Sequence, residues 1–104
     1  MPKPPTDIHD EWFAQAHESG RCAICGKTGV LEAHHIKRRE LRVAWMPENA
    51  ILLCRDHHRL AHNDKTMFML ALKGAAPDKW QFQQDHGNDS PTWDDVRARL
   101  KEKS

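Results

Sequence analysis

Histidine and cysteine residues are concentrated in the middle of the chain, where their spacing suits metal binding. The 104 residues include eight histidines and three cysteines, and five of the histidines lie between positions 34 and 62. Imidazole and thiolate are preferred protein ligands of zinc and related transition metals. The sequence therefore predicts metal chemistry in this segment.

The first group consists of two matched pairs, Cys22-x2-Cys25 and Cys54-x2-His57. A two-residue gap lets both side chains of a pair turn toward one ion, and a structural zinc takes four such ligands in a tetrahedron. The alternative is a buried cysteine pair beside an unrelated cysteine and histidine. Two pairs of identical spacing favour a structural zinc, whose binding stabilises a domain with a small core.

The second group consists of His34, His35, His58 and His62. On a helix, His58 and His62 share a face at positions i and i+4, whereas His57 lies about 100° away and is free for the first group. Adjacent strand residues point to opposite faces, so either His34 or His35 can join His58 and His62 around an ion. The other can stand nearby as a general base, and the spacing does not decide between them. Surface histidines or a second structural zinc are the alternatives.

The elements that must position these groups form an α+β pattern within one small domain. Strands are expected over 30–36 and 49–53, joined by a loop over 37–48 and followed by a helix from Cys54 to His62. Further helices are expected over 10–19, 66–73 and 78–86, the first of them capped by Asp10. A last helix is expected to begin at the capping box formed by Thr92 and Asp95. The pattern predicts a flexible leader over 1–9 and a single domain over 10–104, with its core motif over 21–62 and a helical extension over 63–104.

The positive charge lies on the segment that carries the cysteines and histidines. Residues 21–62 hold eight basic and four acidic residues, a net charge of +4, although the whole chain carries only +1. Such a surface attracts phosphates, and contacts to backbone phosphates give salt-dependent affinity with little sequence information. An ordinary solvated loop is the alternative for the basic run at 37–42. The basic residues predicted to bind nucleic acid are Lys37, Arg38, Arg39, Arg42, Arg55 and Arg59.

Membrane insertion and secretion are not expected. The longest apolar run, Met67 to Leu72, has six residues, whereas a spanning helix needs roughly 20. The first residues lack the apolar stretch of a secretory signal, so we expect a cytoplasmic location.

Taken together, four motifs resemble those of the HNH endonucleases, which belong to the ββα-metal (His-Me finger) nucleases. The resemblance covers residues 21–62, and its motif order and spacing are specific. The motifs are Cys22-x2-Cys25, Glu32-Ala33-His34-His35-Ile36, Pro47-Glu48-Asn49-Ala50 and Leu53-Cys54-x2-His57-His58-x3-His62.

The resemblance implies a role for each matching residue. His35 matches the general base that activates water, and Asn49 matches the residue that supports the loop holding the base. His34 and His58 match metal ligands, and His62 matches an extra helix ligand found in colicin-type nucleases. Cys22, Cys25, Cys54 and His57 match zinc-ribbon positions. Most zinc-bearing relatives have cysteine where His57 stands, and zinc accepts either ligand.

The resemblance implies an endonuclease that hydrolyses DNA phosphodiester bonds, with double-stranded DNA as substrate. Its cofactors would be a structural Zn²⁺ and a catalytic divalent ion, one of Mg²⁺, Mn²⁺, Ni²⁺ or Zn²⁺. The protein is expected to be a monomer or a weak dimer. The resemblance also suggests an origin in a phage or a bacterial mobile element, and protein partners from the same source. The alternative is a non-catalytic zinc-dependent DNA-binding or adaptor module that retains the fold.

Overall fold

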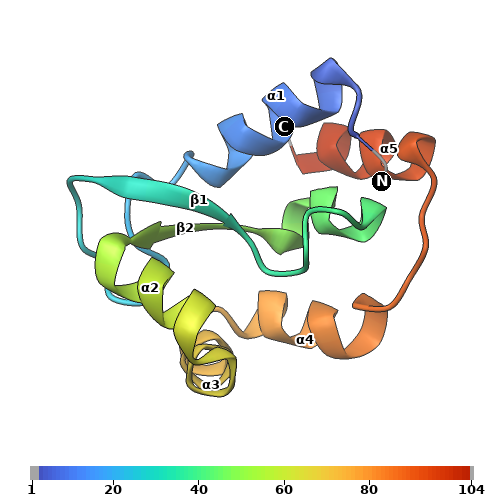
Figure 1. Cartoon of the computed structure of the whole chain (residues 1–104). Coiled ribbons are helices and arrows are strands. Elements are labelled where there is room, and N and C mark those ends of the chain that lie inside the picture. The colour runs from blue at the N-terminus through green and yellow to red at the C-terminus, as the bar shows by residue number, and fades with distance from the viewer. Residues whose placement is uncertain (1–2, 104) are drawn as a thin grey trace.

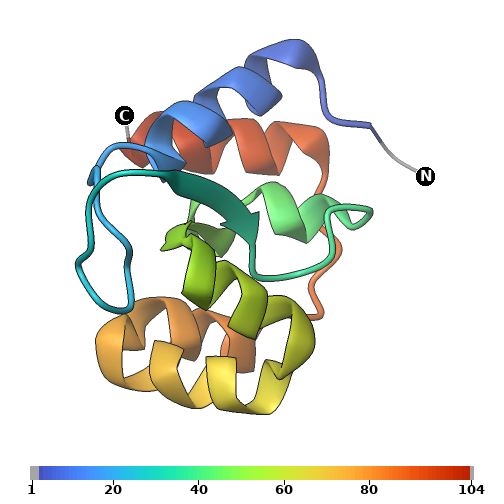
Figure 2. The ribbon, with the colours of Figure 1, turned by 60° about the vertical axis from the view of Figure 1, so that its left-hand side comes forward.

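A two-stranded antiparallel sheet lies between two helical layers in the computed structural model, which describes residues 3–103 (Figure 1). Helices α1 and α5 cover one face of the sheet, and α2, α3 and α4 lie on the other (Figure 2). This arrangement confirms the α+β class. The elements are α1 (Thr6–Ala16), β1 (Leu31–His35), the 3₁₀ helices η1 (Arg42–Trp45) and η2 (Pro47–Asn49), β2 (Ala50–Cys54), α2 (Arg55–Asn63), α3 (Lys65–Ala75), α4 (Pro77–His86) and α5 (Trp93–Lys103).

The sheet register places the two histidines of β1 on opposite faces. His34 pairs with Ile51 and His35 pairs with Ala50, and directly opposed residues of an antiparallel pair share a face. Ile51 belongs to the apolar cluster under α3, whereas Ala50 belongs to the cluster formed with α1 and α5. His34 therefore faces the side of α2 and α3, and His35 faces the side of α1.

The first helix begins earlier than the sequence predicts. It starts at Thr6 rather than at Asp10 and ends at Ala16, and its N-cap residue is Pro5. Residues 6–9 are therefore helical although the sequence places them in a leader, and residues 1–2 of that leader lie outside the described residues. The physical reason is burial of Ile8, which is 1% exposed and packs in one cluster with Trp12 and Leu100.

The segment over 37–48 also departs from the expected loop, because it contains η1 and most of η2. Val43, Ala44 and Trp45 are buried there. Trp45 thus packs in the core.

The last helix follows its sequence signal. The Thr92 hydroxyl accepts from the Asp95 N–H at 3.1 Å, and the Asp95 carboxylate accepts from the Thr92 N–H at 3.0 Å. This reciprocal pair is the expected capping box. Within residues 3–103, no helix has the length and apolar character needed to span a bilayer.

Candidate metal centres and active site

Three cysteines and one histidine converge where β2 passes into α2. One ligand atom from each of Cys22, Cys25, Cys54 and His57 lies within 4.8 Å of the other three. The Sγ of Cys54 is 3.3 Å from Nδ1 of His57 and 3.9 Å from Sγ of Cys25. Sulfur atoms bound tetrahedrally at about 2.3 Å from one zinc stand roughly 3.8 Å apart. The cluster therefore fits a structural zinc.

Local backbone geometry prepares this cluster for a metal. Gly26 follows the first cysteine pair with φ +75°, a conformation that favours glycine. Burial by itself would raise the pKa of the Cys22 thiol, but hydrogen bonds from the backbone of Cys54, Cys25 and Ile24 lower that pKa to about 6. The thiolate form, which binds zinc, is thus favoured near neutral pH.

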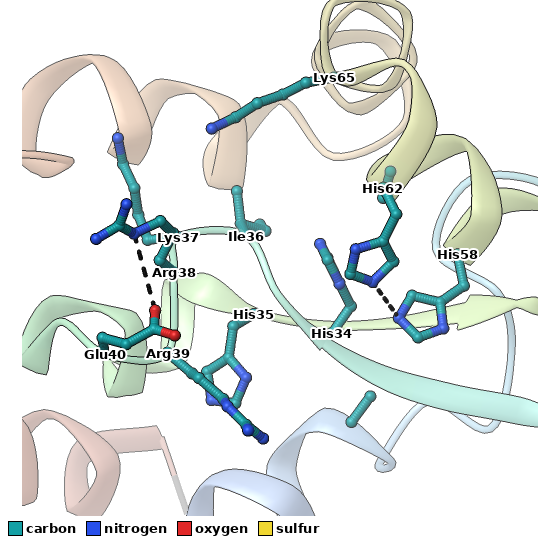
Figure 3. Close-up of a pocket in the computed structure, with 12 residues that line it drawn as sticks. His34, His35, Ile36, Lys37, Arg38, Arg39, Glu40, His58, His62 and Lys65 are labelled. Atoms are coloured by element: carbon teal, nitrogen blue, oxygen red, sulfur yellow. Dashed lines mark hydrogen bonds and ion pairs between the residues drawn. The ribbon is translucent and has the colours of Figure 1, made fainter. Parts of the chain in front are cut away.

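Three further histidines, one from β1 and two from α2, converge in a second cluster. The Nε2 atoms of His58 and His62 are 3.1 Å apart. The ring centroid of His34 lies 5.2 Å from the ring centroid of His58 and 5.1 Å from that of His62. Figure 3 shows the three imidazoles turned toward one another from β1 and α2. Nitrogens about 2.0–2.1 Å from one ion stand roughly 3 Å apart, so this set fits a divalent metal with positions left for other ligands.

The protonation of His34 also suits a ligand. Burial, together with the charges of His58 and His62, lowers the pKa of His34 to about 4. The imidazole is therefore neutral at physiological pH, which is the form that coordinates metals.

Glu32 holds one imidazole of this cluster, and the sequence analysis assigned it no role. Its Oε2 lies 2.8 Å from Nδ1 of His58, so the ring donates this N–H to the carboxylate and keeps Nε2 turned toward the cluster. Metal-binding histidines commonly have such a carboxylate partner. Strand alternation places Glu32 on the same face as His34, and this signal could have identified it.

His35 lies on the other face of β1, in the same cavity as the histidine cluster. The cavity, of about 750 Å³, is lined by His34, His35, His58 and His62 together with cationic side chains. Burial, with smaller contributions from His34, Arg39 and His9, lowers the pKa of His35 to about 4. Its Nε2 is buried without a hydrogen-bond partner among the described residues, so Nδ1 is the nitrogen left to face the cavity. A neutral imidazole at this place can accept a proton.

Asn49 ties the segment around His35 together and is fully buried. The side-chain amide N–H of Asn49 donates to the Val43 carbonyl at 2.7 Å, and the main-chain carbonyl of Asn49 accepts from the Ile36 N–H at 3.0 Å. The Asn49 Oδ1 accepts from Nε2 of Gln83 at 2.8 Å, a contact from α4 that no sequence signal indicated. Asn49 therefore supports the backbone on both sides of residues 37–42.

The structure separates the six predicted phosphate-binding residues into two sets. Lys37, Arg38 and Arg39 line the cavity, and Lys65 of α3, which was not predicted, joins them. The guanidinium of Arg42 instead donates to the Pro91 carbonyl at 2.7 Å. Arg55 and Arg59 are exposed on α2 and are not part of the cavity lining.

A β-hairpin followed by a helix that contributes ligands to two metal-fitting clusters forms a ββα unit. The model of one protein family, described as HNH endonuclease, matches residues 22–69, which span both clusters. Over this segment the chain is similar to that family. No curated protein and no solved structure was found to match the chain.

Proposed function

We propose that this protein is a metal-dependent endonuclease that hydrolyses DNA phosphodiester bonds, with His35 as general base. The observation that carries the proposal is the shared cavity: a metal-fitting histidine cluster, a neutral histidine and four cationic side chains all line it. The family match supports a nuclease function in general, and the arrangement of the cavity supports the residue roles proposed below.

His34, His58 and His62 would hold the divalent ion. When bound, the ion supplies positive charge that stabilises the scissile phosphate and the departing 3′ oxygen. The fold orients two of these imidazoles, His58 through Glu32 and His34 through the register of β1.

His35 would take the proton of the attacking water. Its Nδ1 faces the cavity, and a neutral imidazole accepts the proton while the water oxygen bonds to phosphorus and the P–O3′ bond breaks. Lys37, Arg38, Arg39 and Lys65 would attract the DNA backbone and offset the charge that grows on the phosphate.

The test is cleavage of supercoiled plasmid by the purified protein with Mg²⁺, Mn²⁺, Ni²⁺ or Zn²⁺, beside His35→Ala. We expect nicked or linear plasmid from the wild-type protein and a loss of about 10²- to 10⁴-fold in His35→Ala, the usual contribution of a general base. DNA affinity and zinc content should not change. His86→Ala is the matched control, because His86 is exposed and bonds to Asp89 outside the cavity.

A non-catalytic DNA-binding module is the second candidate, and the same experiment separates it. Such a module would bind DNA without cleaving it in any of the four metals. Full cleavage by His35→Ala would remove His35 from the mechanism.

A further inference from the structure

The imidazole of His35 lies flat against an indole that comes from outside the segment matched to the HNH family. The ring centroids of Trp12 and His35 are 3.8 Å apart, and their planes differ by only 6°. Trp12 is on α1, ten residues before the matched segment begins. A second indole, Trp45, meets His35 edge-on with centroids 4.4 Å apart and an interplanar angle of 68°.

Both indoles are themselves fixed to the chain segment that follows His35. Trp12 Nε1 donates to the Met46 carbonyl at 3.3 Å, and Trp45 Nε1 donates to the Arg39 carbonyl at 3.1 Å. Trp12 has no exposed surface, and Trp45 is 4% exposed. The two indoles therefore hold the imidazole from two sides: Trp12 is stacked parallel to its plane, and Trp45 contacts it edge-on.

Ring packing takes over a task that hydrogen bonds usually perform. The orientation of a functional histidine is commonly set by a hydrogen bond at the nitrogen that does not react. In the described part of the chain, Nε2 of His35 is buried and has no such partner. The plane of the imidazole is thus defined by the indole faces, since rotation about the Cβ–Cγ bond would drive the ring into Trp12.

We propose that Trp12 is a positioning residue for His35: its indole holds the imidazole plane so that Nδ1 points into the cavity at the attacking water. The inference rests on the proposed function, because it assumes that His35 is the base. Small misplacement of a reacting group costs rate rather than binding, and about 1 Å can cost about 10²-fold. Trp12 is covered by protein, so its loss should not remove a DNA contact.

The experiment compares Trp12→Phe and Trp12→Leu with a control of similar effect on stability, Leu100→Ala. Leu100 lies in the same apolar cluster as Trp12 and is 2% exposed, but it is not among the residues that line the cavity. Rates are measured per folded molecule, below the unfolding transition of every variant. We expect kcat to fall by about 10- to 100-fold in Trp12→Leu, to recover partly in Trp12→Phe, and to stay within about twofold in Leu100→Ala, with KM for DNA unchanged throughout.

A spectroscopic measurement keeps the inference testable even where Trp12→Leu folds poorly. Protons above an indole face are shielded, so the ring carbon-bound protons of His35 should resonate upfield of those of the exposed His17 in the wild-type NMR spectrum. In Trp12→Phe the shielding should decrease. Unshielded His35 protons in the wild-type protein would show that the stack does not exist in solution and would overturn the inference.

The kinetic outcomes distinguish this inference from the proposed function. If His35→Ala cleaves like the wild type, the proposed function fails and the positioning role fails with it. If His35→Ala is inactive while Trp12→Leu matches Leu100→Ala in kcat, only the positioning role is overturned. If kcat falls in Trp12→Leu, recovers in Trp12→Phe and leaves KM unchanged, both are supported.

Discussion

Adjacent histidines serve different sites because backbone geometry points their side chains apart. On β1, His34 faces α2 while His35 faces α1 and stacks on Trp12. On α2, His57 joins the cysteine cluster while His58 joins the second cluster. Strand alternation and the 100° step of a helix account for both separations. Two candidate metal centres and the proposed base can therefore be built from a short segment of chain.

Single residues were predictable from the sequence where local periodicity decides their direction. The cysteine cluster and the opposite faces of His34 and His35 follow from spacing alone, whereas the spacing left open which of these two histidines joins His58 and His62. Glu32 carries the same alternation signal but was given no role. Trp12 lies on a helix distant in sequence from His35, and Gln83 lies on a helix distant from Asn49. Only tertiary packing brings each pair into contact.

Replacement of Glu32 should weaken the binding of a divalent ion by the histidine cluster. Without the carboxylate 2.8 Å from its Nδ1, the His58 ring loses its fixed orientation, and we expect Glu32→Ala to lower affinity for the catalytic ion about 10- to 100-fold. Glu32→Gln keeps an acceptor oxygen and should lie between. Titration of Mn²⁺ into the zinc-loaded protein measures the affinity, and Glu18→Gln, an exposed acid outside the cavity, is the control. Equal affinity in Glu32→Ala and the wild type would contradict the orienting role.

At the level of elements, the cysteine cluster holds the helix that carries the second cluster. Cys54 is both the last residue of β2 and the N-cap residue of α2, and His57 lies in the first turn of α2. Cys22 and Cys25 attach this junction to the turn before β1. A zinc bound here would fix the start of α2 and, through it, the direction in which His58 and His62 face His34.

Element boundaries were predictable where a side chain signals them and not where distant packing sets them. Thr92 and Asp95 predict the start of α5, and they form the two hydrogen bonds of the expected capping box. The start of α1 has no capping side chain; Asp7 in its first turn is instead paired with Arg97 of α5, its Oδ2 accepting from the guanidinium at 2.7 Å. The turns η1 and η2 are too short for a periodic pattern, and burial against the sheet stabilises them.

Loss of the candidate zinc ligand Cys25 should therefore reduce stability and cleavage together. Structural zinc contributes several kcal/mol or more to folding, so we expect Cys25→Ser to unfold at least about 10 °C below the zinc-loaded wild type. Chelation of zinc from the wild type should have the same effect and be reversed by added Zn²⁺. Thermal circular dichroism and elemental analysis give the readouts, with Thr28→Ser in the same turn as control. A Cys25→Ser protein with wild-type stability and activity would exclude the coupling between the two clusters.

For the molecule as a whole, the placement of charge matters more than its sum. A net charge of +1 would not by itself indicate a nucleic-acid partner. The fold gathers Lys37, Arg38, Arg39 and Lys65 around the histidines, and only Arg38 among them has a described carboxylate partner, Glu40 at 3.8 Å. The sequence located the basic segment but could not show that α3 adds Lys65 or that Arg42 is turned toward Pro91.

The salt dependence of DNA binding should report this local surface. Each phosphate contact that releases counterions contributes about 0.9 to the slope of log affinity against log salt. Within an uncleaving His35→Ala background, Arg38→Gln/Arg39→Gln should therefore reduce the magnitude of that slope by about two, measured by fluorescence anisotropy on a short duplex from 50 to 200 mM salt. Lys3→Gln/Lys103→Gln removes the same charge from exposed positions outside the cavity and should leave the slope within experimental error. Equal slopes for the two double variants would mean that DNA is attracted by total charge, and the cavity would then lose its place as the phosphate-binding surface.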